Sequence, residues 1–341
     1  VIVKSLAPPS PIGKMSRPTV YMDNFQTTKV PGEVAEAMLP YLTDIYAYPS
    51  SLYTSGLKAG EAVEEALTIV SKTINAKPDE VLFTSGGTES NNLALIGVAR
   101  ARRREGNHII VSKIDHPSIL NTCKALEGEG FKIDYLDVDR EGFIDLQGLE
   151  ALIKDETILV SIIHSSHIIG TIEPIREVAK LLKDQDHKIY LHTDAAVSYG
   201  RLPLDVEELG VDLMTLSSHK IHGPKGVGAL YIRKGTKIEP IQYGFISLFT
   251  LRPGVENVPG IVGFAKAAEI AHENLERDRR YVTRLVERLE KGIMETIPHV
   301  YLNGPGIEKR NPYLLNVSFA YVEGEALLLQ LDMEGVEVAT G

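Results

Sequence analysis

The chain has 341 residues, of which 43% are hydrophobic and 24% charged, and its formal net charge at pH 7 is −10. That length and balance predict a globular protein with one large domain and a smaller one. The acidic charge argues against a nucleic-acid partner, and the one basic cluster, ARARRRE at 99–105, is predicted to be a solvated helix end. No run of 18 apolar residues is present to cross a membrane, and Cys123 is the only cysteine, which favours a reducing compartment, the cytoplasm.

The first 20 residues have prolines and lysines where a secretory signal needs a continuous apolar core, and we expect an N-terminal arm there. Beyond this arm, seven β-rich runs are mostly separated by segments of helical spacing. They are EVLFT (80–84), HIIVS (108–112), KIDYL (132–136), TILVSII (157–163), KIYLH (188–192), VDLMTL (211–216) and VGALYI (227–232). Such runs, with little polar alternation, predict an α/β fold with a mainly parallel seven-stranded sheet and helices on both faces.

The pattern changes toward the end of the chain. Only GPKG, at 223–226, lies between the last two runs, which is too short for a crossover helix, so we expect the last strand to be antiparallel. From residue 257 an amphipathic pattern predicts one long helix, and a strand candidate follows at 314–322. We therefore expect an arm over 1–20, a large domain over 21–256 and a small α+β domain over 257–341.

Ligands of open parallel sheets bind at the carboxyl ends of the strands, and the loops there carry polar groups. SGGTESNN follows the first run, and the N–H groups and helix dipole at Gly87 and Thr88 would bind an anion such as phosphate. The alternative is a tight turn capped by Ser85 or Thr88. His116 stands at another helix start, where it is either a capping group or a ring that stacks on a ligand.

A carboxylate and a lysine follow two further strands. Asp194, in LHTDAA, is either a helix cap or a carboxylate that faces a ligand. Lys220 stands in SSHKIHGPKG together with Ser217 and His219. Because lysine is rarely buried without a partner, Lys220 is either a solvated loop residue or a reactive amine.

Together these groups are the parts that hold pyridoxal 5'-phosphate. A lysine forms the Schiff base, a helix start binds the phosphate, and an imidazole stacks on the ring. A carboxylate keeps the pyridine nitrogen protonated, so that the ring can accept electrons. The sequence therefore predicts an enzyme that uses pyridoxal 5'-phosphate, and it suggests no metal site.

Longer stretches carry a family resemblance. They include VYMDNFQTTKV, VLFTSGGTESNNLAL, SKIDHPSIL, LHTDAA, DLMTLSSHKIHGPKGVGALYIRKG and RPGVENVPGIVGFAKAAEIA. From about Tyr21 onward the chain resembles the cysteine desulfurases, class V aminotransferase-like enzymes of fold-type I. This resemblance implies a homodimer whose chains complete each other's active sites. It also implies conversion of L-cysteine to L-alanine, with sulfur passed to an iron–sulfur scaffold or to another acceptor protein, as in tRNA thiolation.

The resemblance also assigns residues. Lys220 matches the Schiff-base lysine, Asp194 the partner of the pyridine nitrogen, and His116 the stacking histidine that takes part in proton transfer. Four residues match the phosphate cradle: Gly87, Thr88, Ser217 and His219.

Several positions depart from the family pattern. His167 stands where the family has an asparagine near the cofactor's phenolic oxygen, and Val197 stands where it has a glutamine. Other replacements are bulky or apolar: Tyr48, Tyr53, residues 244–250 and Val255. We expect these replacements to form one active-site wall that is more apolar than in the family. Such a wall would suit a changed substrate or a degraded site.

The end of the sequence raises a second question. In the family, a stretch like GVEVATG (335–341) precedes a loop with the nucleophilic cysteine and an arginine that binds the substrate carboxylate. This sequence stops at Gly341, so we expect an incomplete small domain without that loop, and we interpret Cys123 as structural. Three interpretations stay open. The protein is a cysteine desulfurase, a family member that acts as a lyase or transaminase on another amino acid, or a desulfurase-like scaffold that binds a partner.

Overall fold

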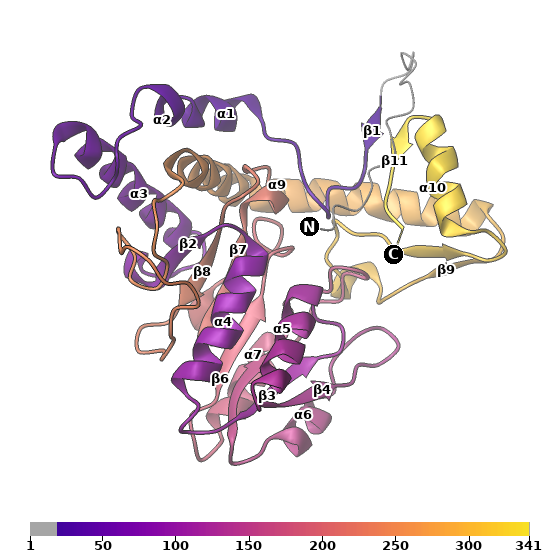
Figure 1. Ribbon diagram of the computed structural model, residues 1–341. Coiled ribbons are helices and arrows are strands. Elements are labelled where there is room, and N and C mark those ends of the chain that lie inside the picture. Colours follow the sequence, from indigo (N-terminus) through magenta and orange to yellow (C-terminus); the bar gives the residue numbers. More distant parts are fainter. Residues whose placement is uncertain (1–18, 341) are drawn as a thin grey trace.

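The computed structural model describes residues 19–340, so most of the predicted N-terminal arm lies outside the described residues. The centre of the fold is a seven-stranded sheet with the strand order β2-β8-β7-β6-β5-β3-β4 (Figure 1). Strands β3 to β7 run parallel, and β8 is antiparallel to both β2 and β7. The predicted α/β fold and the predicted direction of the last strand are confirmed.

The elements have the following bounds. The strands of the large sheet are β2 (Val81–Thr84), β3 (His108–Ser112), β4 (Lys132–Leu136), β5 (Thr157–Ser161), β6 (Tyr190–Asp194), β7 (Leu213–Ser217) and β8 (Gly228–Ile232). The short strands are β1 (Val20–Tyr21), β9 (Val300–Leu302), β10 (Val317–Phe319) and β11 (Val336–Glu337). The helices are α1 (Gly32–Met38), α2 (Pro40–Thr43), α3 (Thr54–Lys72), α4 (Gly87–Ala101), α5 (Pro117–Gly128), α6 (Leu146–Leu152), α7 (Ile175–Lys183), α8 (Val206–Leu209), α9 (Val258–Thr296) and α10 (Gly324–Met333), with 3-10 turns η1 (Pro78–Glu80), η2 (Ser218–Lys220) and η3 (Ile307–Lys309).

Each face of the large sheet has its own apolar core. Successive side chains of a strand point to opposite faces, so in β3 Ile110 belongs to one core while Ile109 and Val111 belong to the other. Helices α4 and α5 cover the second face and lie in front of the sheet in Figure 1. Helices α3, α7 and the first part of α9 cover the first face. Because both faces are covered, the strands read as continuous apolar runs in the sequence.

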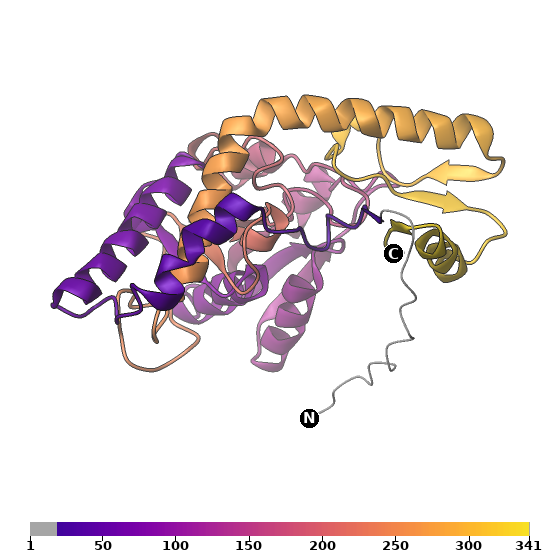
Figure 2. The same cartoon turned by 90° about the horizontal axis from the view of Figure 1, so that it is seen from above.

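Helix α9 joins the two parts of the chain. Its first turns are in the core of the large sheet, where Phe264 contacts the rings of Phe83 and Tyr199. Figure 2 shows the helix continuing to the small antiparallel pair β9 and β10. In the small part, β1 pairs parallel with β11, although more than 300 residues separate them. The domain division at 256/257 stays a prediction, and the buried first turns of α9 pack with the larger domain.

The predicted strand ends are less accurate than the predicted strands. The strand expected at 188–192 is observed at 190–194, because the ladder with β5 begins at Tyr190. The candidate at 314–322 is reduced to 317–319, the three residues that pair with β9. The cluster at 99–105 is also not fully solvated, because Arg102 is only 3% exposed and donates to the carbonyl oxygens of Ile158 and Lys188.

Candidate active site

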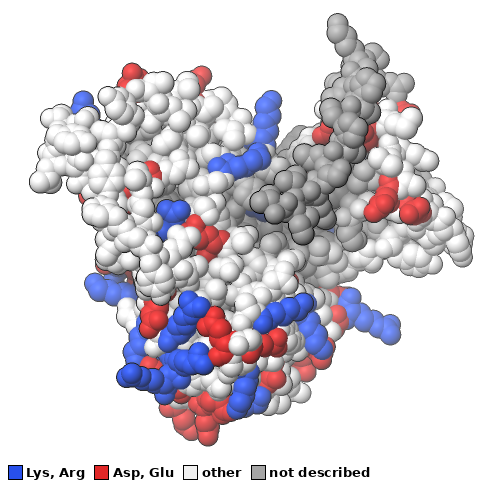
Figure 3. All heavy atoms as spheres, in the orientation of Figure 1, with Lys and Arg blue, Asp and Glu red and all other residues white. Residues whose placement is uncertain are grey.

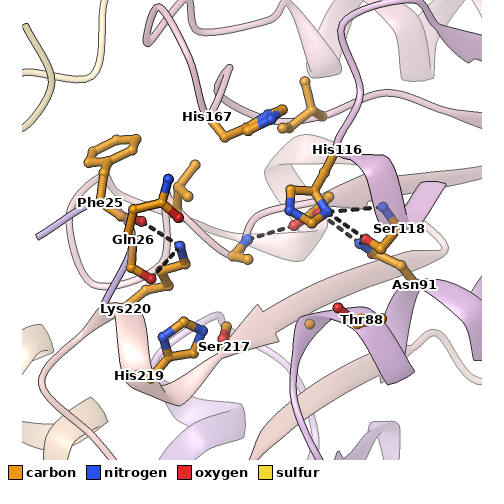
Figure 4. Close-up of a pocket in the computed structure, with 15 residues that line it drawn as sticks. Phe25, Gln26, Thr88, Asn91, His116, Ser118, His167, Ser217, His219 and Lys220 are labelled. Carbon is orange, nitrogen blue, oxygen red and sulfur yellow. Dashed lines mark hydrogen bonds between the residues drawn. The ribbon is translucent and has the colours of Figure 1, made fainter. Parts of the chain in front are cut away.

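A cavity of about 240 Å³ lies at the carboxyl ends of the parallel strands. Its walls come from the loops after β2, β3, β5, β6 and β7 and from the segment after β1. All eight residues predicted as site residues line it: Gly87, Thr88, His116, His167, Asp194, Ser217, His219 and Lys220. In Figure 4, Thr88, Ser217 and His219 lie along one edge, and Lys220 and His116 stand on opposite sides above them.

The N-terminus of α4 forms one wall of the cavity. The first intrahelical bond is from the Ser90 N–H to the Gly86 carbonyl, so the N–H groups of residues 87–89 precede the hydrogen-bonded turns. Gly86 has a φ of 148°, and Gly228 of β8 packs so closely that a Cβ on it would be 2.7 Å from the Gly86 Cα. These two glycines therefore set the position of the helix start. Glu89 in this turn is paired with Arg252 at 2.7 Å.

A hydrogen-bond chain crosses the middle of the site. The Asn91 side-chain amide donates to Asp194 Oδ2 at 2.7 Å and to Ser118 Oγ at 2.8 Å. Ser118 Oγ lies 2.7 Å from His116 Nδ1, which also accepts from the Ser118 backbone N–H at 3.1 Å. His116 Nδ1 is therefore an acceptor, which leaves the proton of the neutral ring on Nε2. The helix-cap alternative for Asp194 is wrong, because a turn rather than a helix follows it; Oδ1 accepts from the Ala196 N–H of that turn, while Oδ2 belongs to the cavity chain.

Lys220 is a half-buried amine held by backbone carbonyls rather than a fully solvated loop residue. Its Nζ donates to the carbonyl oxygens of Phe25 and, at 2.9 Å, of Gln26 (Figure 4). Burial lowers the pKa of Lys220 to about 8, and the charge of Arg201 acts in the same direction against the carboxylates of Asp194 and Asp23. At pH 7 about a tenth of this amine is therefore uncharged, far more than for an exposed lysine.

The imidazoles of the cavity are neutral at pH 7. Burial lowers the pKa of His167 to about 4, helped by the nearby His116 and Lys220. The pKa of His219 is also lowered to about 4, by burial first and then by Lys220. Burial lowers the pKa of His116 as well, against the attraction of Asp194. The rings of His116 and His167 meet edge to face with centroids 5.0 Å apart, so the replacement at 167 puts a second imidazole beside the first.

The sequence reasoning missed several residues of the site. Asn91 and Ser118 connect Asp194 to His116, and Phe25 and Gln26 hold Lys220 through their carbonyl oxygens. All four lie inside stretches that carry the family resemblance, and a search for polar side chains within two residues of the expected ones would have found Ser118. The role of the Phe25 and Gln26 backbone has no sequence signal.

The positions that depart from the family pattern lie in different parts of the structure. Of the replaced positions, only His167 and Val197 line the cavity, whereas Tyr53, Phe245 and Val255 are exposed elsewhere. The prediction that all the replacements form one active-site wall is therefore wrong within this chain.

Cys123 is fully buried in α5, and burial raises the pKa of its thiol to about 12, in agreement with a structural role.

Residues 19–340 contain neither a metal-binding cluster nor a membrane-spanning helix. No group of three or more histidine, cysteine or acidic side chains there is arranged to hold a metal ion. None of the helices in that range has the length and apolar character needed to span a membrane.

Comparison with known proteins gives consistent results. The family described as "Aminotransferase class-V" matches residues 20–341. The cysteine desulfurase IscS of Dictyoglomus turgidum is 50% identical over 322 residues, which cover 94% of this chain and 81% of that protein. The cysteine desulfurase IscS of Methanosarcina thermophila is 46% identical, with 94% and 79% covered.

Solved structures agree with the sequence comparison. A NifS-like protein superposes with a TM-score of 0.92 at 38% identity and covers 95% of this chain and 88% of its own. SspA in complex with cysteine superposes with a TM-score of 0.81 at 34% identity, with 94% and 89% covered. The chain therefore belongs to the class V aminotransferase family and, within it, to the cysteine desulfurases.

Proposed function

We propose that this protein is a cysteine desulfurase that holds pyridoxal 5'-phosphate on Lys220 and removes sulfur from L-cysteine. The observation that carries the proposal is the cavity itself, which joins a half-buried amine of lowered pKa, a helix N-terminus and the Asp194 carboxylate. These are the groups that a pyridoxal-phosphate enzyme needs, and the relatives named cysteine desulfurases support the substrate.

The residues present fit this cofactor. Ser217 is 1% exposed, its Oγ has no hydrogen-bond partner among the described residues, and it lines the cavity beside Gly87 and Thr88. Such a buried donor is normally satisfied, and a phosphate oxygen at the start of α4 would satisfy it. We assign the phosphate to Gly87, Thr88, Ser217 and His219. We assign the pyridine nitrogen to Asp194 and the phenolic oxygen to His167.

The residues of the site would have separate roles in the reaction. The bound cofactor supplies the electron sink for negative charge at the substrate carbon beside the amino group. Lys220 would hold the cofactor, and as a free amine it can accept a proton at Nζ. His116 presents a proton at Nε2, because Nδ1 is occupied by Ser118. Asn91 and Ser118 fix the orientations of Asp194 and His116.

Replacement of Lys220 tests the proposal, with Lys225 as the matched control because it also lies between β7 and β8 and is exposed. The wild-type protein and Lys225→Ala should bind pyridoxal 5'-phosphate with visible absorbance, and borohydride should fix the cofactor on the peptide that contains Lys220. Lys220→Ala should lose both signals. A label on any other lysine would contradict the proposal.

The substrate and the acceptor are tested separately. SspA was solved in complex with cysteine, which supports cysteine as the substrate here. Release of alanine from cysteine, with dithiothreitol as the thiol that takes the sulfur, should distinguish a desulfurase from a family member with another substrate. Because Cys123 is buried and its thiol pKa is about 12, the sulfur is taken by a different thiol. We propose that the sulfur is passed on to an iron–sulfur scaffold or another acceptor protein in the cytoplasm.

We also propose a homodimer. Two segments that contact each other through Ser50 and Ser247 expose large apolar side chains: Leu42, Tyr46, Leu52, Tyr53, Tyr243, Phe245, Ile246 and Val255. Apolar side chains concentrated in this way favour an interface. In Figure 3, the region over α1 and α2 shows few charged side chains, whereas such side chains are dense over the opposite end. The segment of residues 243–255 is linked to the start of α4 by the ion pair between Arg252 and Glu89. An interface formed by this segment would therefore reach the proposed phosphate end of the site.

A further inference from the structure

Arg201 is a buried cation next to the site, and none of the roles assigned so far uses it. It lies in the turn after β6 and is 5% exposed. Its Nη2 donates to the carbonyl oxygen of Asn24 at 2.7 Å and to the carbonyl oxygen of Lys220 at 2.9 Å. Its guanidinium carbon also lies 4.6 Å from the ring centre of Phe25 and 5.5 Å from that of Tyr313.

These contacts join three parts of the chain that are distant in sequence. Asn24 and Phe25 belong to the segment that follows β1, and the Phe25 carbonyl accepts from Lys220 Nζ. Tyr313 follows η3 in the smaller part of the molecule. Arg201 thus contacts Lys220 in two ways, directly through the Lys220 carbonyl and indirectly through the segment whose carbonyls hold the amine.

The surroundings of Arg201 differ from those of an ordinary buried arginine. No described carboxylate lies within ion-pair distance of it, and its Nη1 has no described hydrogen-bond partner. Arg102 is equally buried, donates hydrogen bonds to two carbonyl oxygens and lies over the ring of Tyr190. Unlike Arg201, however, it forms an ion pair with Glu105 at 2.7 Å. Burying an unpaired charge is costly, and burial lowers the pKa of Arg201 to about 10, so it is still charged at neutral pH.

We propose that Arg201 is a positioning residue for Lys220, because its guanidinium ties residues 24–25, the Lys220 loop and Tyr313 into one buried contact. The proposal rests on the proposed role of Lys220. Arg201 does not line the cavity, so it acts through the lysine rather than on a substrate. It holds the Lys220 backbone in place, and its unpaired charge favours the neutral form of the amine.

The charge effect has a definite sign. The charged groups that act on Lys220 are Arg201, which favours the neutral amine, and Asp194 and Asp23, which favour the ammonium. The cavity imidazoles are His116, His167 and His219, and all three are neutral at pH 7 because their pKa values are lowered. Loss of the Arg201 charge should therefore raise the pKa of Lys220. A rise of one unit in the pKa of Lys220 would lower the neutral fraction of its amine at pH 8 roughly fivefold.

The experiment compares the wild-type chain with Arg201→Gln, Arg201→Lys and the control Arg102→Gln. Arg102 lies near the amino ends of β5 and β6, whereas Lys220 follows the carboxyl end of β7. Two readouts are made on the full chain without added cofactor. The first is the pH dependence of Lys220 acetylation by acetic anhydride, measured by peptide mass spectrometry. The second is amide hydrogen exchange over residues 23–28 and 218–222.

Each variant has a distinct expected result. Arg201→Gln should acetylate Lys220 about fivefold more slowly at pH 8 and exchange faster in both segments, since the Thr28 N–H is bonded to the His219 carbonyl. Arg201→Lys keeps the charge, so its pH midpoint should stay near that of the wild type while exchange in both segments is still faster. Arg102→Gln should change neither readout, even where it lowers stability.

Failure of the inference can be told apart from failure of the proposed function. Unchanged acetylation and exchange in both Arg201 variants would overturn the inference. If Arg201→Gln does not fold, Arg201→Lys with unchanged exchange in the two segments overturns it alone. Labelling of the wild-type chain by pyridoxal 5'-phosphate and borohydride is run in parallel. A label on Lys220 retains the proposed function whatever the Arg201 variants do, and no label there rejects it.

Discussion

Lys220 illustrates how the reactivity of one residue depends on its surroundings. The side chain is the same as in the other lysines, but burial and the charge of Arg201 lower its pKa to about 8. A lysine attacks a carbonyl only as the neutral amine, and an exposed lysine with a pKa of about 10.4 is almost fully charged at pH 7. The fold therefore makes this lysine more reactive than the rest.

The first prediction concerns the pH dependence of cofactor loading. The rate at which cofactor-free protein binds pyridoxal 5'-phosphate covalently should rise between pH 6 and pH 9, with a midpoint near 8, because protonation of Lys220 below its pKa removes the nucleophile. Stopped-flow absorbance at each pH measures the rate. A midpoint near the usual lysine value, above 10, would show that burial does not act on this amine.

The second prediction concerns Cys123. Its thiol is fully buried and has a raised pKa of about 12, so iodoacetamide at pH 8 should alkylate it only after unfolding in guanidinium. Cys123→Ala should leave alanine formation from cysteine unchanged and lower the free energy of unfolding by about 1 kcal/mol, as for the loss of a small buried group. A large loss of activity with normal folding would mean that the thiol has a chemical role.

At the scale of elements, the site depends on where helices and strands end. The start of α4 faces the cavity because β2 ends at Thr84 and Gly86 adopts a conformation that other residues avoid. Gly228 of β8 packs closely against Gly86 and so holds this turn in position. The proposed phosphate end of the site therefore depends on backbone packing as well as on side chains.

The third prediction uses these glycines. A Cβ at position 228 would lie 2.7 Å from both the Gly86 Cα and the Leu216 carbonyl oxygen, so Gly228→Ala should displace the start of α4 and cost about 1–3 kcal/mol of stability. It should also weaken binding of pyridoxal 5'-phosphate in an equilibrium titration. Gly292→Ala is the control, because that position in α9 has open space around it. The control should be neutral or gain about 0.5–1 kcal/mol in thermal unfolding. Equal effects of the two changes would contradict this account.

At the scale of the whole molecule, large apolar side chains are exposed on two neighbouring segments. Leu52 is 91% exposed and Phe245 75% exposed, and the two segments that carry them contact each other. A single chain gains nothing by leaving such side chains in water, whereas burying them between two copies is favourable.

The fourth prediction follows from this surface. The wild-type chain should sediment at twice the mass of one chain, and Leu52→Glu or Phe245→Glu should shift it to the monomer, because a charge would be buried at the interface. Tyr301→Glu is the control. This side chain is 60% exposed, but it lies on β9, far along the chain from the two apolar segments. A wild-type monomer, or dissociation by the control alone, would reject the proposed interface.

Prediction from the sequence succeeded where a local pattern has one physical meaning. Apolar runs bounded by turns identified all seven strands of the large sheet, and GPKG determined the direction of β8. The strand at 314–322 was predicted too long, because its ends depend on pairing with β9, which the local pattern does not contain. The buried position of Arg102 was missed for a similar reason, since its partners are carbonyls more than 50 residues away.

The sequence by itself predicted the fold from local periodicity, and its resemblance to the cysteine desulfurases supplied the family and completed the set of eight candidate site residues. Only the tertiary structure decided how those groups meet. The Phe25 and Gln26 carbonyls reach Lys220, Asn91 links Asp194 to Ser118, and Arg201 lies behind the lysine. These contacts join residues distant in sequence and use backbone atoms that every residue has, so no residue pattern encodes them. The pKa of Lys220 was likewise set by burial, which exists only after the chain has folded.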